Sequence, residues 1–259
     1  MKDQNDINPN VFWYVVGYIA ADGSLSKDNR HVSITSKDHS HLENIKKELG
    51  ITSRITKKSR GFGKEKIYSV LQMGGVSTYR FLNSIGMFSR KSWGMGELKI
   101  NEEYFIDFLR GVIDGDGCIY SWKHKNNKHI QWSLRITGAA PKFIYWLKDS
   151  MEKRLSVKGK MHTQNYQTKS TIYIIKFDKL ATQTIVTSTY YDNCFCLERK
   201  LMKARECLQD KAKMLKYGQV ICSSGEIGKR NRLKICRSQD PVGSIPTSST
   251  NKTPIAKLP

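Results

Sequence analysis

The chain has 259 residues, of which 39% are hydrophobic, so it can bury a core and is not disordered throughout. Its 44 Lys and Arg residues outnumber its 23 Asp and Glu residues, and the net charge of +21 favours a polyanionic partner such as nucleic acid over a surface that is merely solvated. The chain lacks the run of ~18 apolar residues that a membrane span needs, and the polar start MKDQNDINPN is unlike a signal or transit peptide. We therefore expect an intracellular, non-secreted protein with no membrane partner.

The first half begins with an apolar helical stretch, VVGYIAADGSL from Val15, which ends in Asp-Gly. A β-type run and an amphipathic helix follow in HVSITSKDHSHLENIKKELGI, from His31. The basic strand ITSRITKKS then precedes an alternating strand and a helix in KIYSVLQMGGVSTYRFLNSIG, from Lys66. This order predicts helix–strand–strand–helix–strand–strand–helix for residues 1–85, and we expect the glycine-containing segment 86–104 to be a linker.

The second half repeats these elements in the same order. Its apolar stretch FLRGVIDGDGCIY, from Phe108, again ends in Asp-Gly, and QWSLRITGAAPKFIYWLKDSMEKRL, SVKGKMHTQ and TIYIIKFDKLATQTIVTSTYY follow. Residues 105–217 are therefore predicted to form a second αββαββα half. Residues 218–259 are rich in Ser, Thr, Pro and Gly without amphipathic periodicity, which predicts a disordered basic tail.

A glycine lies inside each apolar helix, Gly17 in the first and Gly111 in the second. A glycine inside a helix costs roughly 0.5–1 kcal/mol relative to alanine, so we expect a close contact between the two helices to offset that cost. Such a contact brings Asp22 and Asp116 together at the negative ends of the two helix dipoles, where each carboxylate is unfavourable and the two repel. A divalent cation with a preference for hard oxygen ligands would resolve this arrangement.

Two common interpretations, a hairpin turn at each Asp-Gly pair and a zinc site at the cysteines, do not fit this sequence. An Asp-Gly pair is common in hairpin turns, but two copies with matching flanks favour helix ends, with Gly23 and Gly117 as left-handed caps. The six cysteines contain no CxxC pair and have no His pair at zinc-ligand spacing nearby. We therefore expect reduced thiols and no zinc site.

The segments Val15 to Gly23 (VVGYIAADG) and Leu109 to Gly117 (LRGVIDGDG) resemble the motif of the two-motif LAGLIDADG homing endonucleases, and the likeness covers about residues 10–215. The resemblance implies an α+β fold of two pseudo-symmetric αββαββα halves, whose antiparallel sheets form a DNA-binding saddle around two central motif helices. It also implies a monomer, encoded by an intron or another mobile element, that cleaves double-stranded DNA with Mg²⁺, for which Mn²⁺ can substitute. The first copy departs from the consensus at the inner acid, where Ala20 stands in place of the second copy's Asp114.

The same resemblance assigns the site. It implies metal binding by the outer acids and by the residues that precede them: Asp22, Asp116, Ala21 and Gly115. It also implies that the two acids are catalytic. The basic segments GMFSRKSWG and CFCLERKLMK, near the end of each half, would supply Lys91 and Lys200, which activate water or neutralise charge. A lysine that is only solvated near a helix boundary is the alternative for each.

Antiparallel sheets with one face on helices leave the other face polar, and alternation in RHVSITSK directs Val32 and Ile34 towards the core. Such strands fit a major groove, where polar side chains read base edges, while lysines in loops hold phosphates. The candidate DNA contacts are Lys27, Arg30, Ser33, Thr35, Arg54, Lys57, Lys64, Lys123, Lys125, Gln131, Ser133, Arg135, Lys158, Lys160, Gln164 and Gln167. We expect Trp132, Trp146 and Tyr145 to belong to the core.

Two alternatives remain open at this point. An intron maturase would use the same fold to bind its own intron RNA, with or without cleavage, although the retention of both outer acids favours cleavage. A transcription regulator on the same scaffold would need an added helix-turn-helix segment, and the tail shows none.

Overall fold

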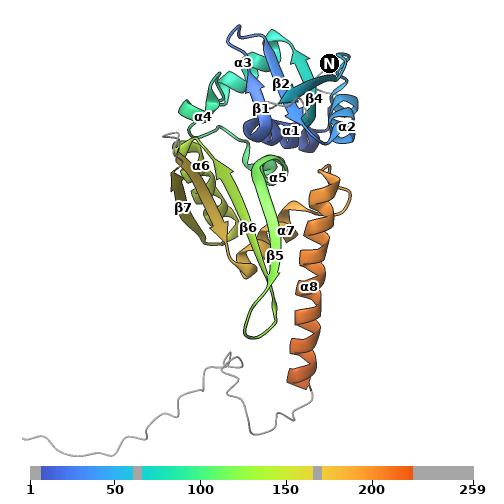
Figure 1. Ribbon diagram of the computed structural model, residues 1–259, viewed down its shortest axis with the longest axis vertical. Helices are drawn as coiled ribbons and strands as arrows, with labels where there is room; N and C mark the ends of the chain where they lie inside the picture. Colours follow the sequence, from blue (N-terminus) through green and yellow to red (C-terminus); the bar gives the residue numbers. More distant parts are fainter. Residues whose placement is uncertain (1–6, 61–65, 166–170, 224–259) are drawn as a thin grey trace, which may run out of the picture. The chain divides into compact units, whose positions relative to one another are not determined.

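A computed structural model describes residues 7–60, 66–165 and 171–223, and the described residues up to Lys216 form one compact unit (Figure 1). The elements of the first half are α1 (Pro9–Asp22), β1 (Gly23–Leu25), β2 (His31–Ser36), α2 (His39–Leu49), β3 (Thr56–Arg60), β4 (Lys66–Gly74) and α3 (Val76–Ser84). Those of the second half are α5 (Phe105–Asp116), β5 (Gly117–Lys123), β6 (Ile130–Gly138), α6 (Pro141–Leu155), β7 (Gly159–Asn165), β8 (Thr171–Phe177) and α7 (Lys179–Thr189). The predicted α+β order of two αββαββα halves is confirmed.

The connecting and terminal segments contain helices that the sequence patterns did not predict. The segment expected to be a linker includes a single turn, α4 (Lys91–Gly94), and a 3₁₀ turn, η2 (Glu102–Tyr104). Helix α8 (Glu198–Ser223) continues into the segment expected to be disordered, and the rest of that segment, 224–259, lies outside the described residues. None of the described helices is both long and apolar enough to cross a membrane.

Each half contains one four-stranded antiparallel sheet, in the order β1-β2-β4-β3 and β5-β6-β8-β7. One face of each sheet is covered by helices of its own half, α1, α2 and α3 in the first and α5, α6 and α7 in the second. Val32 and Ile34 are buried on the covered face of the first sheet, as predicted, and Trp132 is buried in the second half. Tyr145 is wrongly predicted as core, because it lies on the outer side of α6 with 47% of its surface exposed.

Helices α1 and α5 pack against each other over most of their length (Figure 1). Their glycines make this possible, because a Cβ at Gly17 would lie 1.9 Å from the Phe108 carbonyl oxygen and one at Gly111 would lie 2.0 Å from the Tyr14 carbonyl oxygen. Such distances leave no room for any side chain. The mid-helix glycines are therefore the residues that let the two backbones meet, as their cost in an isolated helix suggests.

The prediction for the glycines that end these helices was wrong. Gly23 and Gly117 are extended, with φ of −77° and −81°, and are not left-handed. Space requires glycine here, because a Cβ at either position would lie within 2.6 Å of the carbonyl oxygen four residues back, that of Ile19 or Ile113. In each half, the chain thus passes directly from the motif helix into the first strand of the sheet.

Candidate active site and nucleic-acid interface

The two outer acids lie at the adjoining ends of α1 and α5. A Cβ at Gly115 would lie 2.4 Å from the Ala21 Cβ and 3.5 Å from the Asp22 Oδ2, so the Asp22 carboxylate lies beside the last turn of α5, which ends at Asp116. Loss of water around Asp116 and the nearby charge of Asp22 raise the pKa of Asp116 to about 6. Desolvation also raises the pKa of Asp22, although part of its side chain reaches solvent. The structure thus juxtaposes two carboxylates that resist ionising together.

Lys91 crosses from α4 to the end of α1. Its Nζ donates to the carbonyl oxygens of Ile19, Ala20 and Ala21 at 2.6, 2.5 and 2.5 Å, where the helix dipole is negative. Burial lowers the pKa of Lys91 to about 8, against the opposing charges of Asp116 and Asp22. An ammonium group therefore lies close to both acids.

Lys200 holds a corresponding position in the second half. It is buried in the first turns of α8, and its Nζ donates to the carbonyl oxygen of Gly117, directly after Asp116. Burial lowers its pKa, and the charge of Arg199 acts in the same direction. The structure thus brings together the two acids and the two lysines that the sequence singled out, one lysine beside each motif.

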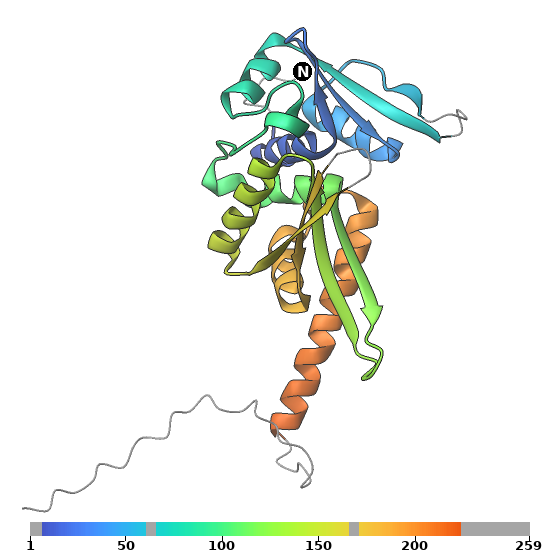
Figure 2. The same ribbon diagram turned by 60° about the vertical axis from the view of Figure 1, so that its left-hand side comes forward.

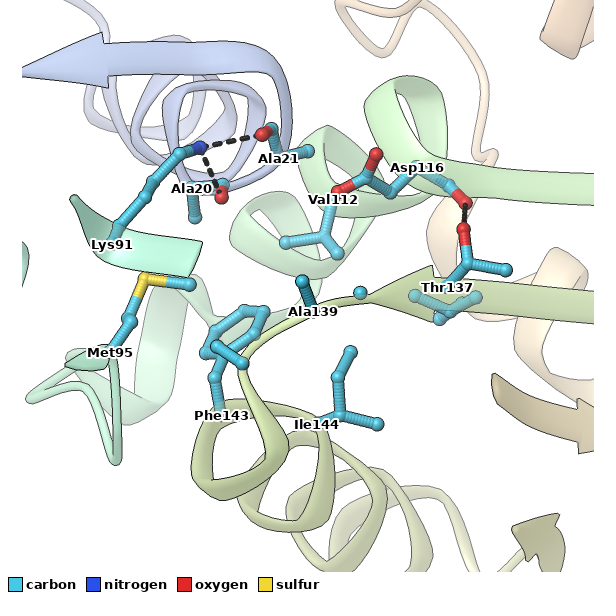
Figure 3. A pocket seen from close by; sticks show the side chains of 13 residues that line it. Ala20, Ala21, Lys91, Met95, Val112, Asp116, Thr137, Ala139, Phe143 and Ile144 are labelled. Carbon is cyan, nitrogen blue, oxygen red and sulfur yellow. Dashed lines mark hydrogen bonds between the residues drawn. The ribbon is translucent and has the colours of Figure 1, made fainter. Parts of the chain in front are cut away.

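A small cavity of about 50 Å³ opens beside Asp116 (Figure 3). Lys91 and Met95 lie on one side of it and Asp116 and Thr137 on the other, and the Thr137 hydroxyl donates to the Asp116 carbonyl oxygen at 3.5 Å. This volume exceeds the roughly 10–15 Å³ that one water molecule needs. The cavity therefore has room for water next to the carboxylate.

The donor set suits a hard divalent cation. Two carboxylates and the neighbouring carbonyl oxygens of Ala21 and Gly115 are the oxygen ligands that Mg²⁺ prefers. The Ala21 oxygen already accepts from Lys91 but keeps a second lone pair. Nowhere in 7–60, 66–165 and 171–223 do three or more His, Cys, Asp or Glu side chains gather as a ready metal cage, so a bound ion would need further ligands from water or a substrate.

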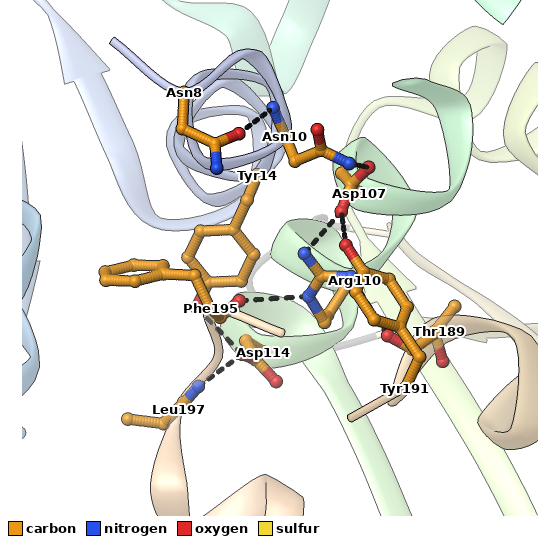
Figure 4. A network of polar contacts seen from close by, with 10 residues as sticks. All are labelled: Asn8, Asn10, Tyr14, Asp107, Arg110, Asp114, Thr189, Tyr191, Phe195 and Leu197. Atoms are coloured by element: carbon orange, nitrogen blue, oxygen red, sulfur yellow. Dashed lines mark hydrogen bonds and ion pairs between the residues drawn. The ribbon is translucent and has the colours of Figure 1, made fainter. Parts of the chain in front are cut away.

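The inner acid of the second motif has a structural role that the sequence did not reveal. Asp114 is fully buried and accepts hydrogen bonds from the Tyr14 hydroxyl at 2.8 Å and the Leu197 amide at 2.6 Å (Figure 4). It also accepts from the Tyr190 hydroxyl at 2.6 Å. Tyr14 comes from α1, and Leu197 lies one residue before α8. Asp114 therefore ties both motif helices to the segment that positions Lys200.

A buried ion pair reinforces the same region. Arg110 is fully buried, pairs with Asp107 at 2.5 Å and donates to the carbonyl oxygens of Thr189 and Phe195 at 3.0 and 2.9 Å (Figure 4). Asp107 also accepts from the Tyr191 hydroxyl at 2.6 Å. The spacing of Asp107 and Arg110, three residues apart on α5, is the only sequence signal of this network.

The helix-free face of the first sheet carries mostly neutral polar groups. Ser33 and Thr35 lie on it, half-buried, opposite Gln72 and Val70 of β4. Lys57 lies on the other face, in register with Ser69, whose hydroxyl contacts His39 of α2. Lys58 instead shares the open face with Tyr68. The sequence pattern missed Lys58, because one residue of register decides which of these two exposed lysines lies on the helix-free face.

The helix-free face of the second sheet is cationic. Arg135, Lys176 and Lys160 lie side by side across β6, β8 and β7 in register, and Gln164 lies further along β7 on the same face. The Arg135 guanidinium also stacks on Tyr120 of β5, 4.4 Å from the ring centroid. Ser133 has no exposed surface, and its hydroxyl donates to the Phe177 carbonyl oxygen at 2.7 Å, so it has nothing left to offer a base.

The remaining candidate contacts lie around these faces. Exposed positions in hairpins and loops, or at strand ends next to them, are Lys27, Arg30, Arg54, Lys123, Lys125 and Lys158, and Gln131 is half-buried on β6. Lys64 and Gln167 lie outside the described residues.

Comparison with known proteins agrees with this geometry. Residues 9–86 match the LAGLIDADG-like domain family. Solved structures similar to the chain include the homing endonuclease I-WcaI bound to its DNA recognition sequence, at 13% identity and a TM-score of 0.54 over 76% of this chain and 87% of that one. The LAGLIDADG homing endonuclease I-GzeII in complex with its DNA target has 14% identity and a TM-score of 0.54, over 82% of this chain and 92% of that one. The chain has the two-motif LAGLIDADG fold.

The LAGLIDADG fold is not restricted to proteins described as endonucleases. Full-length DUF199/WhiA from Thermatoga maritima matches at 13% identity and a TM-score of 0.51, over 82% of this chain. The chain spans 66% of that protein, just under two thirds of its length. No curated protein matches the chain by sequence. The comparisons thus establish the LAGLIDADG fold of this chain, while its chemistry depends on the residues at the ends of α1 and α5.

Proposed function

We propose that the protein is a site-specific homing endonuclease, which makes a double-strand break in a long, asymmetric DNA target and acts as a monomer. The observation that carries the proposal is the pair Asp22 and Asp116 at the adjoining ends of α1 and α5. Both carboxylates lie at negative helix ends, and the pKa of Asp116 is raised to about 6. The fold gains nothing from this pair by itself, whereas a divalent cation and a phosphodiester substrate would use it.

Asp22 and Asp116 would hold Mg²⁺, or Mn²⁺ in its place, with the carbonyl oxygens of Ala21 and Gly115 beside them. The bound ion supplies Lewis-acid polarisation of the phosphate and lowers the pKa of a bound water. Lys91 and Lys200 place positive charge where negative charge develops on the phosphate oxygens. With a pKa of about 8, Lys91 can also exchange a proton through its Nζ near neutral pH.

Recognition would fall to the open faces of the two sheets. The first face offers mainly neutral hydrogen-bonding groups such as Ser33, Thr35 and Gln72, and the second offers the cationic row Arg135, Lys176 and Lys160. Because the two faces differ in charge and in side chains, they would read different half-sites. A single chain of this kind suits a target without dyad symmetry, such as the insertion site of an intron or another mobile element.

The proposal is tested with purified protein and fragmented genomic DNA in Mg²⁺, with sequencing of every new end. We expect discrete double-strand breaks with 3′ overhangs from the native chain and none from Asp22→Asn or Asp116→Asn. Asp192→Asn, which removes an exposed carboxylate outside the site, is the matched control and should cleave normally. Binding without breaks in both Mg²⁺ and Mn²⁺ refutes the endonuclease assignment.

A second candidate is nucleic-acid binding without cleavage, as in a maturase that assists the splicing of its own intron RNA. The contacts of Lys91 with three carbonyl oxygens at the end of α1 favour it, because they occupy part of the oxygen set that an ion would use. Splicing of a precursor RNA by the native chain and equally by Asp116→Asn would support this candidate. Loss of splicing in Asp116→Asn would count against it.

A further inference from the structure

The second sheet contains a pocket where β6 and β8 separate. Their pairing stops at Arg135 and Lys176, because β8 ends at Phe177 while β6 extends back to Ile130 (Figure 2). A pocket of about 370 Å³ lies at this fork. The residues that line it come from β5, β6, β7 and the chain around the end of β8, and include Trp122, Gln131, Lys160, His162 and Lys176. The pocket therefore interrupts the open face that we assign to nucleic acid.

The lining carries uncompensated positive charge. Lys160 and Lys176 lie directly opposite each other in register, and neither makes an ion pair within the part of the chain that the structure describes. Like charges at such positions destabilise a sheet. Lys158 adds a third positive charge, while the one lining carboxylate, that of Asp178, accepts from the Ala181 amide as the cap of α7. An anionic ligand would therefore stabilise this end of the sheet.

The rim of the pocket is aromatic. Trp122 is 42% exposed and stacks on Tyr120, with ring centroids 5.3 Å apart and an interplanar angle of 22°. The Arg135 guanidinium covers Tyr120 as well, so the three side chains form a stacked row on the open face. An exposed aromatic ring beside cationic groups is the usual platform for an unpaired base.

The pocket also offers hydrogen-bonding groups. Gln131 and His162 lie on its open side and can pair with the edge of a base. Trp132, between Gln131 and Ser133 on β6, points to the helix-covered side, where the Lys203 Nζ of α8 lies 5.5 Å from its ring centroid, so the open side depends on Gln131 and His162.

We propose that this pocket holds one unpaired nucleotide of a bound nucleic-acid strand, with its base against Trp122 and its phosphate on Lys160 and Lys176. A base that stays within a duplex presents only its edges in the grooves, so it cannot enter this pocket of about 370 Å³ with its whole ring. Turning a nucleotide out of the stack costs a few kcal/mol, least where it is already unpaired, and stacking on an aromatic ring offsets part of that cost. The inference rests on the proposed function only in that the ligand is nucleic acid, and it does not require cleavage.

The test compares two labelled duplexes of one sequence, with and without a single bulged 2-aminopurine nucleotide, in fluorescence anisotropy with the full-length protein. We expect the native chain to bind the bulged duplex about tenfold more tightly, as expected for one base–aromatic stack, and to quench the 2-aminopurine. Trp122→Ala should abolish both the preference and the quenching while it leaves the fully paired duplex bound as before. Tyr145→Ala, which removes an equally exposed ring from α6, is the matched control and should change neither.

Further variants and probes separate the possible outcomes. Lys176→Ala should weaken the bulged duplex more than the paired one, whereas Lys58→Ala on the other sheet should weaken both alike. An RNA with the same bulge, measured in parallel, shows which nucleic acid is preferred. Equal affinity for both duplexes, or a preference that survives Trp122→Ala, overturns the inference. Asp116→Asn separates this result from the proposed function, because it should lose cleavage and keep the bulge preference.

Discussion

Asp116→Asn should make the protein more stable, and on the proposed function it should also abolish cleavage. In the native chain the pKa of Asp116 is raised from 3.8 to about 6, which corresponds to about 3 kcal/mol of unfavourable free energy when the carboxylate is charged. Asparagine keeps the shape and removes the charge. Because repulsion by Asp22 and partial solvent access both affect this value, we expect a gain of about 1–3 kcal/mol at pH 8.

The pH dependence of this gain identifies its cause. A raised carboxyl pKa means that the folded state binds more protons than the unfolded state between about pH 4 and pH 6. The stability of the native chain therefore falls relative to that of the variant as pH rises through this window, and the difference is constant above it. Thermal unfolding at several pH values measures it, with Asp192→Asn as the control, which should follow the native chain at every pH.

Added Mg²⁺ gives a second readout in the same assay. If Asp22 and Asp116 hold Mg²⁺ as we propose, the ion would stabilise the native chain by mass action and Asp116→Asn much less, so the difference in melting temperature should narrow. If Asp116→Asn is less stable than the native chain at pH 8, or if the difference does not change between pH 4 and pH 7, the argument from desolvation and repulsion is wrong.

Three further predictions follow from the packing. Gly17→Ala places a Cβ 1.9 Å from a backbone oxygen of α5, so it should lower the free energy of unfolding, measured by chemical denaturation, by about 3 kcal/mol or more. Gly94→Ala is the control, because a Cβ there would meet no neighbouring atom within 4 Å, and it should cost less than about 1 kcal/mol. Asp114→Leu leaves the buried Tyr190 hydroxyl and Leu197 amide without an acceptor, while the Tyr14 hydroxyl keeps its contact with the His41 Nε2 at 2.8 Å. This variant should lower stability by about 3 kcal/mol or more, and a stability equal to that of the native chain would refute the bracing role. A hydrogen bond from Cys196, together with the charge of Arg110, lowers the pKa of Cys194 to about 7. Iodoacetamide at pH 7.5 should therefore modify Cys194 before the more exposed Cys118, and peptide mass spectrometry measures the order.

The sequence predicted those features that repeat or have a local period. The two Asp-Gly motifs, the strands with alternating apolar residues and the amphipathic helices between them were sufficient for the fold of both halves. Glycines inside apolar helices led correctly to a close contact between α1 and α5, because only such a contact explains their cost.

Features that depend on the exact strand register or on contacts between distant residues could not be predicted from the sequence. The position of Lys58, and not Lys57, on the helix-free face depends on the register in which β3 pairs with β4. The bracing by Asp114 of α5 combines the Tyr14 hydroxyl of α1 with the Tyr190 hydroxyl and the Leu197 amide of the segment between α7 and α8, and no local pattern links these positions. The extended conformation of Gly23 reflects the direct passage from helix to strand, which an Asp-Gly pair does not reveal.

The contact between α1 and α5 limits how the two halves can be recombined. Gly17 of the first half packs against the backbone at Phe108 of the second, and Gly111 of the second half packs against the backbone at Tyr14 of the first. Each half therefore has a glycine that fits the helix backbone of the other half. A chimera that joins this first half to a foreign second half would therefore need a glycine at the equivalent of Gly111 and a partner for the Tyr14 hydroxyl, which Asp114 supplies here. Specificity could then be exchanged one half at a time, provided that this single helix pair is transferred or matched as a unit.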